Sequence, residues 1–180
     1  MNIFYLDPSP IASVDYMSNK HIIKMILESA QLLCTAHYEL DGVTKLNGVE
    51  LYKPTHKNHP SAVWVRDNLL HYEWLYSHFI ALSEEYTYRY GKTHETYKKL
   101  AKALKTPPKS IVEKGFVAPP PAMPDKYKVE GNSMRSYMNY YRAEKLFTDE
   151  DKRRWNKYIR LSKEYIEEQQ WVRHRKKLLV

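Results

Sequence analysis

Residues 20–37, KHIIKMILESAQLLCTAH, decide the fold of this chain. As an α-helix, this stretch would present apolar side chains over most of its surface, so the helix should be largely buried. One line of polar residues interrupts that surface at steps of three and four, which places them on a single helix face. We call this line the polar stripe; it consists of His21, Lys24, Glu28, Gln31 and Thr35.

The polar stripe is a candidate wall of an active site. A cation beside a carboxylate and an imidazole is costly to bury unless these groups are paired or neutralised. In an acid–base or amine-nucleophile site, Lys24 would be the nucleophile or an electrostatic anchor, Glu28 the carboxylate and His21 the proton shuttle. The same pattern also suits the exposed edge of a core helix, or an internal polar network without chemistry.

Composition places the chain among single-domain, water-soluble proteins. Its 180 residues, 43% hydrophobic and 28% charged, suffice for one core. No apolar run approaches the ~18 residues that a membrane span requires, and the start MNIFYLDPSP lacks the features of a signal peptide. The single cysteine, Cys34, excludes an internal disulfide framework. We therefore expect a cytoplasmic protein without a membrane partner or cofactor, and the sequence leaves its oligomeric state open.

Charge and aromatic content predict a nucleic-acid partner. The net charge of +8 accompanies 16 tyrosines and 4 tryptophans, and basic groups among aromatics suit a polyanion with stackable bases. Two segments concentrate these residues: the loop YKPTHKNHP at 52–60 and EEYTYRYGKTH at 84–94. An ordinary surface loop and a solvated helix end are the simpler alternatives. The candidate DNA contacts are Lys20, His56, Lys57, His59, Arg66, Tyr88, Arg89, Lys92 and His94.

A metal site is the alternative use of the histidines in the loop. His56 and His59 stand three residues apart and could share a metal, with His21 or His94 as a further ligand. The chain contains no HExxH or CxxC motif to support this. We therefore expect no metal, and keep a metal-assisted hydrolase as an alternative function.

Hydrophobic periodicity and turn signals predict a mainly α fold. A short extended segment at 2–6 should open the chain, a hairpin or loop should follow the striped helix, and a proline-rich irregular segment should span 107–131. Thr148 and Asp151 resemble a capping box at the start of the last helix. The predicted helices span about residues 11–17, 19–38, 61–90, 94–104, 134–145 and 148–176. We expect one compact helical domain, with a core and active-site cleft in residues 1–147, and a long C-terminal helix, 148–180, packed on or extending from it.

Several segments resemble the phage-encoded pyrimidine-dimer DNA glycosylases of the endonuclease V type. They lie within about residues 2–145 and are NIFYLDPSP, KHIIKMILESAQLLCTAH, KPTHKNHPSAVWVR, EEYTYRYGKTH and SYMNYYRAEK. The resemblance implies base excision, in which a nucleotide is flipped out, an amine attacks C1′ of the sugar, and an AP-lyase step follows through an imine.

The resemblance also implies which groups react. In that family the amine is the α-amine exposed when the initiator methionine is removed, and a helical glutamate assists; Glu28 would be that glutamate. Asn2 is too large for the usual trimming, so we expect Met1 to stay and the amine to be misplaced or replaced by Lys24.

The leading hypothesis is a phage-derived DNA N-glycosylase/AP-lyase, acting on damaged or modified pyrimidines in the cytoplasm of an infected bacterium. A non-catalytic module that binds nucleic acid or a host protein is the main alternative.

Overall fold

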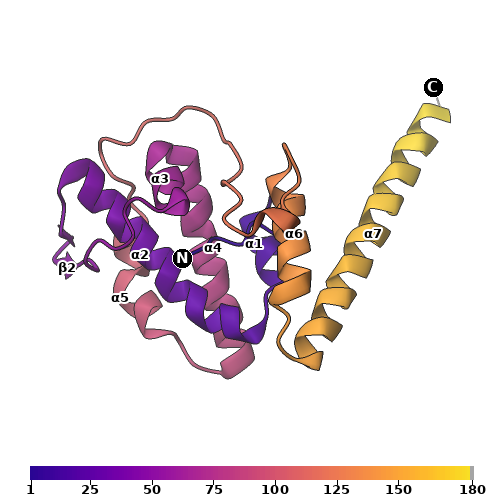
Figure 1. Cartoon of the computed structure of the whole chain (residues 1–180), viewed down its shortest axis with the longest axis horizontal. Helices are drawn as coiled ribbons and strands as arrows, with labels where there is room; N and C mark the ends of the chain where they lie inside the picture. Colours follow the sequence, from indigo (N-terminus) through magenta and orange to yellow (C-terminus); the bar gives the residue numbers. More distant parts are fainter. Residues whose placement is uncertain (179–180) are drawn as a thin grey trace.

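Helix α2 (Asn19–Asp41) crosses the middle of the molecule and is the striped helix of the sequence (Figure 1). The computed structural model describes residues 1–178, with side chains described up to residue 164. Within that part the fold is mainly α and forms one domain, as predicted. The other elements are α1 (Pro10–Asp15), β1 (Lys45–Leu46), β2 (Val49–Glu50), α3 (Pro60–Asp67), α4 (Leu69–Tyr90), α5 (Glu95–Leu104), the 3-10 turn η1 (Asp125–Tyr127), α6 (Ser133–Glu144) and α7 (Asp149–Leu178).

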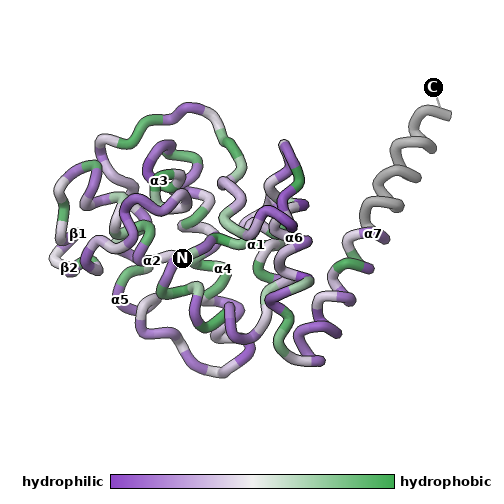
Figure 2. The backbone as a smooth tube through the Cα atoms, viewed as in Figure 1, coloured by the Kyte–Doolittle hydropathy of each residue, from purple (hydrophilic) through white to green (hydrophobic). Residues whose placement is uncertain are grey.

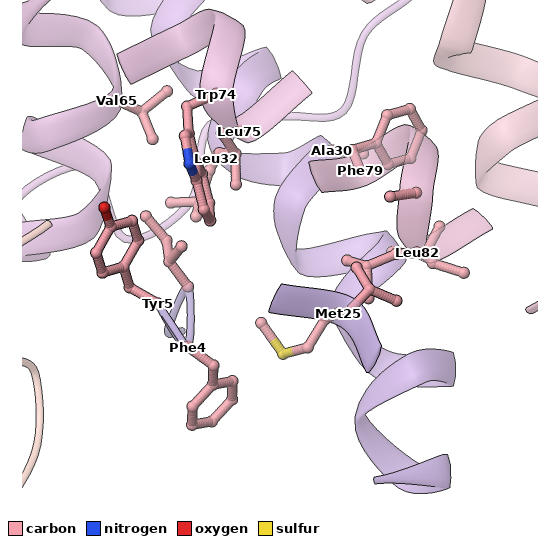
Figure 3. Close-up of a cluster of buried hydrophobic side chains, with 14 of the residues drawn as sticks. Phe4, Tyr5, Met25, Ala30, Leu32, Val65, Trp74, Leu75, Phe79 and Leu82 are labelled. Atoms are coloured by element: carbon pink, nitrogen blue, oxygen red, sulfur yellow. The ribbon is translucent and has the colours of Figure 1, made fainter. Parts of the chain in front are cut away.

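The core forms where α2 packs against α3, α4 and α5, while α1 packs against α4. Apolar segments of α2 and α4 face each other in the interior, and polar segments lie mostly outside (Figure 2). Figure 3 shows side chains of the two helices meeting beside Phe4 and Tyr5 of the N-terminal segment. That segment is therefore part of the core: Ile3, Phe4, Tyr5 and Leu6 are all buried.

The predicted helix over 61–90 was wrong at Asn68, where the chain divides into α3 and α4. Asn68 has an extended backbone (φ −151°, ψ 137°), and its Oδ1 accepts a hydrogen bond from the Leu70 amide at 3.1 Å. Asparagine side chains compete in this way with the helical backbone and favour N-cap positions. The amide nitrogen of Asn68 also donates to the Gly115 carbonyl, so a contact distant in sequence stabilises the break.

The segment after α2 is a hairpin rather than a loop. Strands β1 and β2 are antiparallel, with Leu46 opposite Val49. Asn47 (φ 50°) and Gly48 (φ 80°) form the turn between them, and both positive φ angles match the type I′ turn that Asn-Gly pairs favour. The hairpin lies at the opposite end of the molecule from α7 (Figure 1).

The capping box at the start of α7 is confirmed. The Thr148 amide donates to Oδ2 of Asp151 at 3.1 Å, and the Asp151 amide donates to Oγ1 of Thr148 at 3.1 Å. Further along α7, Trp155 is buried and stacks on Tyr141 of α6, with ring centroids 5.7 Å apart. The first half of α7 thus packs on the core. Within the described residues, no helix has the length and apolarity that a membrane crossing demands.

Candidate active site

The exposed part of α2 is narrow and contains the middle of the polar stripe. Lys24 Nζ lies 3.1 Å from Glu28 Oε1; the Lys24 side chain is 62% exposed, whereas that of Glu28 is only 12% exposed. The prediction that the apolar surface of this helix is buried fails at Ile23 and Leu27, which are exposed next to Lys24. The stripe is therefore accessible at Lys24, and the cost of burying a cation does not arise there.

The far end of the stripe lies against the basic loop. Thr35 is fully buried, its hydroxyl donates to the Gln31 carbonyl at 2.7 Å, and it accepts the Thr55 amide at 3.3 Å. Because Thr55 precedes His56, these bonds hold the loop beside the polar face of α2. The loop and the stripe thus belong to one region of the surface.

The pKa of His59 depends on several charged groups of this region. Its Nδ1 accepts the Ser61 amide at 3.2 Å and so caps α3. Burial lowers the pKa of His59, and the positive charges of the Met1 α-amine and His56 lower it further, while Glu28 raises it. The charges of the terminal amine, His56 and Glu28 therefore all influence the protonation of His59.

The Met1 α-amine belongs to the charged groups of this region. Its charge lowers the pKa of His59, whereas the charge of Glu28 raises it. The expectation that a retained Met1 leaves the amine out of position for catalysis stays a prediction. Asn2 holds the segment in place, because its side-chain amide donates to the Ala122 carbonyl at 2.8 Å. Only the apolar run 3–6, which predicts a buried start to the chain, hinted at this placement.

Phe4 directs the N-terminal segment across the start of α2. Its backbone has a positive φ of 55°, which is strained for a bulky side chain and must be maintained by its surroundings. The Phe4 ring stacks on His21, with centroids 4.5 Å apart, and meets Tyr141 edge-on at 5.1 Å. The strain is thus compensated by aromatic packing next to the stripe.

His21 lies inside this aromatic group rather than in an open cleft. The side chain is buried, and its Nδ1 is 2.7 Å from the Tyr141 hydroxyl. Burial, assisted by nearby lysines of which Lys145 contributes most, lowers the pKa of His21 to about 4. The imidazole is therefore neutral at pH 7, and this geometry suits packing better than proton transfer to a substrate.

The predicted DNA contacts fall into two groups. The first surrounds the loop: Arg66 Nη1 donates to the Lys57 carbonyl at 2.6 Å, and Lys57 Nζ lies 4.0 Å from Glu39. His56 and Lys57 are exposed. Lys20, nearer the start of α2, lies over the Phe147 ring at 4.7 Å from its centroid.

The second group lies around the C-terminal end of α4. Arg89 contacts Met17 and Asn19, next to the start of α2, so it does not share the surroundings of the loop. Tyr88 and Lys92 are exposed. His94 caps α5 by accepting the Thr96 amide at 3.2 Å, and burial lowers its pKa. The candidate DNA contacts therefore fall into two clusters, one at the basic loop and one where the end of α4 meets the start of α2.

Among the residues whose side chains the structure describes, no group of three or more histidine, cysteine or acidic side chains is arranged to hold a metal ion. His56 and His59 therefore lack the further protein ligands that the metal-assisted alternative requires in this part of the chain.

A comparison with models of known protein families shows to which family the chain belongs. The model of the family described as pyrimidine dimer DNA glycosylase matches residues 1–99. This chain belongs to the pyrimidine dimer DNA glycosylase family. The match covers both the polar stripe and the basic loop, whereas α6 and α7 lie beyond it. Membership of this family implies a DNA glycosylase-like role and DNA as the binding partner. No curated protein and no solved structure matches the chain.

Proposed function

We propose that this family member is a DNA N-glycosylase/AP-lyase acting on damaged or modified pyrimidines. The observation that carries the proposal is that Glu28, mostly buried and paired with the accessible Lys24, lies on the polar face that Thr35 joins to the basic loop, within the segment that matches the family. An unprotonated amine attacks C1′ of an extruded nucleotide and displaces the base. The resulting imine allows a proton to leave C2′ and the 3′ phosphate to depart, and water then releases the enzyme.

Two amines are candidates for the nucleophile, Lys24 and the α-amine of Met1. Model α-amines are roughly 300-fold less basic than lysine side chains, so more of an α-amine is unprotonated at neutral pH. Lys24 is largely exposed and paired with Glu28, so burial does not activate it. These points favour the α-amine in a chain that begins at Met1, with Lys24 as the electrostatic anchor.

Glu28 is the group best placed to move the proton. Its side chain is mostly buried, and its Oε1 lies 3.1 Å from Lys24 Nζ. Its charge also raises the pKa of His59. The exposed loop residues His56 and Lys57, together with Arg66, would hold the DNA backbone next to this carboxylate.

Borohydride trapping on DNA that contains an abasic site or a UV dimer tests the proposal. We expect a covalent adduct whose peptide map places it on Met1 rather than Lys24. Glu28→Gln should lower the rate by about 100-fold or more, as for loss of a general acid–base group. Lys24→Gln should reduce the rate less, and Lys45→Gln, on the hairpin, is the control of equal charge change.

An adduct on Lys24 would transfer the nucleophile to the stripe and leave the glycosylase/lyase function in place. Binding of DNA without any adduct or base release, and with no effect of Glu28→Gln, would leave only the non-catalytic binding module.

A further inference from the structure

A second cationic site lies where α4 meets the first turns of α7. A pocket of about 370 Å³ opens between the two helices. Arg89 contributes to it from α4, and Arg153, Arg154 and Lys157 contribute from α7. Glu85 and Glu150 are the two carboxylates of the lining, so four cations face two anions. The α7 residues lie outside the segment that matches the family.

Arg89 forms the floor of the site and has unused hydrogen-bonding capacity. Its side chain is only 6% exposed. Nε lies 2.5 Å from Glu85 Oε1, and Nη1 donates to Asn19 Oδ1 at 2.8 Å. Nη2 is buried and has no hydrogen-bond partner. A buried donor without a partner is costly and uncommon in folded proteins, so it points to a ligand.

The other cations of the pocket differ in whether other side chains hold them in place. Arg154 is held, because Nη1 donates to Asn19 Oδ1 at 3.0 Å and Nη2 donates to Glu150 Oε1 at 2.7 Å. Arg153 and Lys157 are exposed, and neither has an ion-pair partner among the side chains that the structure describes. Pre-positioned guanidinium groups beside exposed cations suit an oxyanion with several acceptor oxygens, and phosphate has that chemistry.

We propose that this pocket binds a backbone phosphate of the DNA, at a site separate from the candidate active site. The proposal rests on the proposed function only in taking DNA as the partner. A phosphate oxygen seated against Arg89 would supply the partner that Nη2 lacks.

The distance between the two sites sets the length of DNA required. Asn19, beside the pocket, and Glu28 are nine residues apart on α2, which at 1.5 Å per residue is roughly 14 Å along the helix axis. With a rise of about 3.4 Å per nucleotide, the second phosphate lies at least about four nucleotides from the lesion. DNA that ends sooner on that side should lose this contact.

The test compares two double variants of the full chain that remove equal charge from α7. Arg153→Gln/Lys157→Gln empties the mouth of the pocket; Lys152→Gln/Arg160→Gln, which changes two other exposed cations of the helix, is the control. Affinity for a duplex of about 20 base pairs is measured against salt concentration. The pocket variant should bind about tenfold more weakly, with a salt slope smaller by about one, and the control should change less than about twofold.

The outcomes separate this inference from the proposed function. Weaker binding by the pocket variant alone supports the site even if no trapped adduct forms, because adduct formation tests only the chemistry. Equal effects of the two double variants, or no effect of either, overturn the site. The site is also overturned if the affinity of the pocket variant depends on DNA length in the same way as that of wild type. Binding of inorganic phosphate by wild type but not by the pocket variant, with equal DNA affinities of the two proteins, would assign the pocket to a free anion instead and overturn the DNA contact.

Discussion

His21 and Lys24 lie one helical turn apart on α2, yet the structure gives them opposite environments. Lys24 is largely exposed and bonded to Glu28, whereas His21 is enclosed by Phe4, Tyr141 and Phe147. Their spacing in the sequence places both on one face of the helix. It does not determine how deeply each side chain is buried, because burial depends on what packs against each turn. Depth in turn decides whether an ionisable group can reach a substrate or only stabilise the fold.

Replacing His21 should reduce the dependence of stability on pH. The folded protein binds a proton at His21 only near pH 4, whereas the unfolded chain does so near 6.5. The contribution of this group is therefore complete above about pH 6.5 and is lost progressively as the pH falls toward 4. Between pH 7 and 5 the loss is about 2 kcal/mol. Urea unfolding of His21→Gln should show a decrease smaller by that amount, and an unchanged pH dependence would contradict the assignment.

At the scale of elements, Asp151 joins the beginnings of two helices. Its Oδ2 accepts the Thr148 amide in the capping box of α7, and its Oδ1 accepts the Asn19 amide at the start of α2, at 2.9 Å. The carboxylate is buried, and a negative charge at a helix N-terminus is favoured by the helix dipole. A local motif of α7 thus also positions the helix that contains the polar stripe.

Two alanine variants separate the local and the shared role of this cap. Thr148→Ala should cost about 1 kcal/mol, as for loss of one N-cap side chain. Asp151→Ala should cost clearly more, roughly 2–4 kcal/mol, because two backbone amides lose a charged acceptor and the hydrogen bond that joins α7 to α2 is lost. Chemical denaturation measures both free energies of unfolding, with Thr148→Ser as the conservative control. Equal costs for Thr148→Ala and Asp151→Ala would mean that Asp151 acts on α7 alone.

For the whole molecule, the first turns of α7 contribute to the same core as residues 1–147. Trp155 of α7 is buried, stacks on Tyr141 and meets Tyr16 edge-on at 5.5 Å. Tyr16 also bonds through its hydroxyl to Ser162 at 2.5 Å. The start of α7 is therefore part of the packing that supports α1 and α6.

Truncating the Trp155 side chain should destabilise the entire domain. Loss of a large buried aromatic costs about 3–5 kcal/mol because a cavity remains, so Trp155→Ala should lower the melting temperature by roughly 6–20 °C. Leu161→Ala, at an exposed site of the same helix, should change the free energy of unfolding by less than about 0.5 kcal/mol. A stable core in Trp155→Ala would instead support residues 1–147 as an independent unit.

The sequence by itself determined the features that depend on near neighbours. The helical spacing of α2 and the pairing of Lys24 with Glu28 follow from contacts within five residues, as do the capping box at Thr148 and Asp151. Apart from the division at Asn68, helix boundaries agree within about two or three residues for the same reason. Local periodicity and capping chemistry suffice for such features.

Only the tertiary structure decided the features that join distant segments. The break at Asn68 is stabilised by Gly115, the charges of the terminal amine and Glu28 both affect the pKa of His59, and Arg89 lines a pocket together with residues of α7. None of these contacts leaves a periodic signal, because each depends on how separate helices pack and on which side chains the packing buries. The sequence therefore indicated which types of residue could act in the site, whereas their arrangement in space depends on how the helices pack in the core.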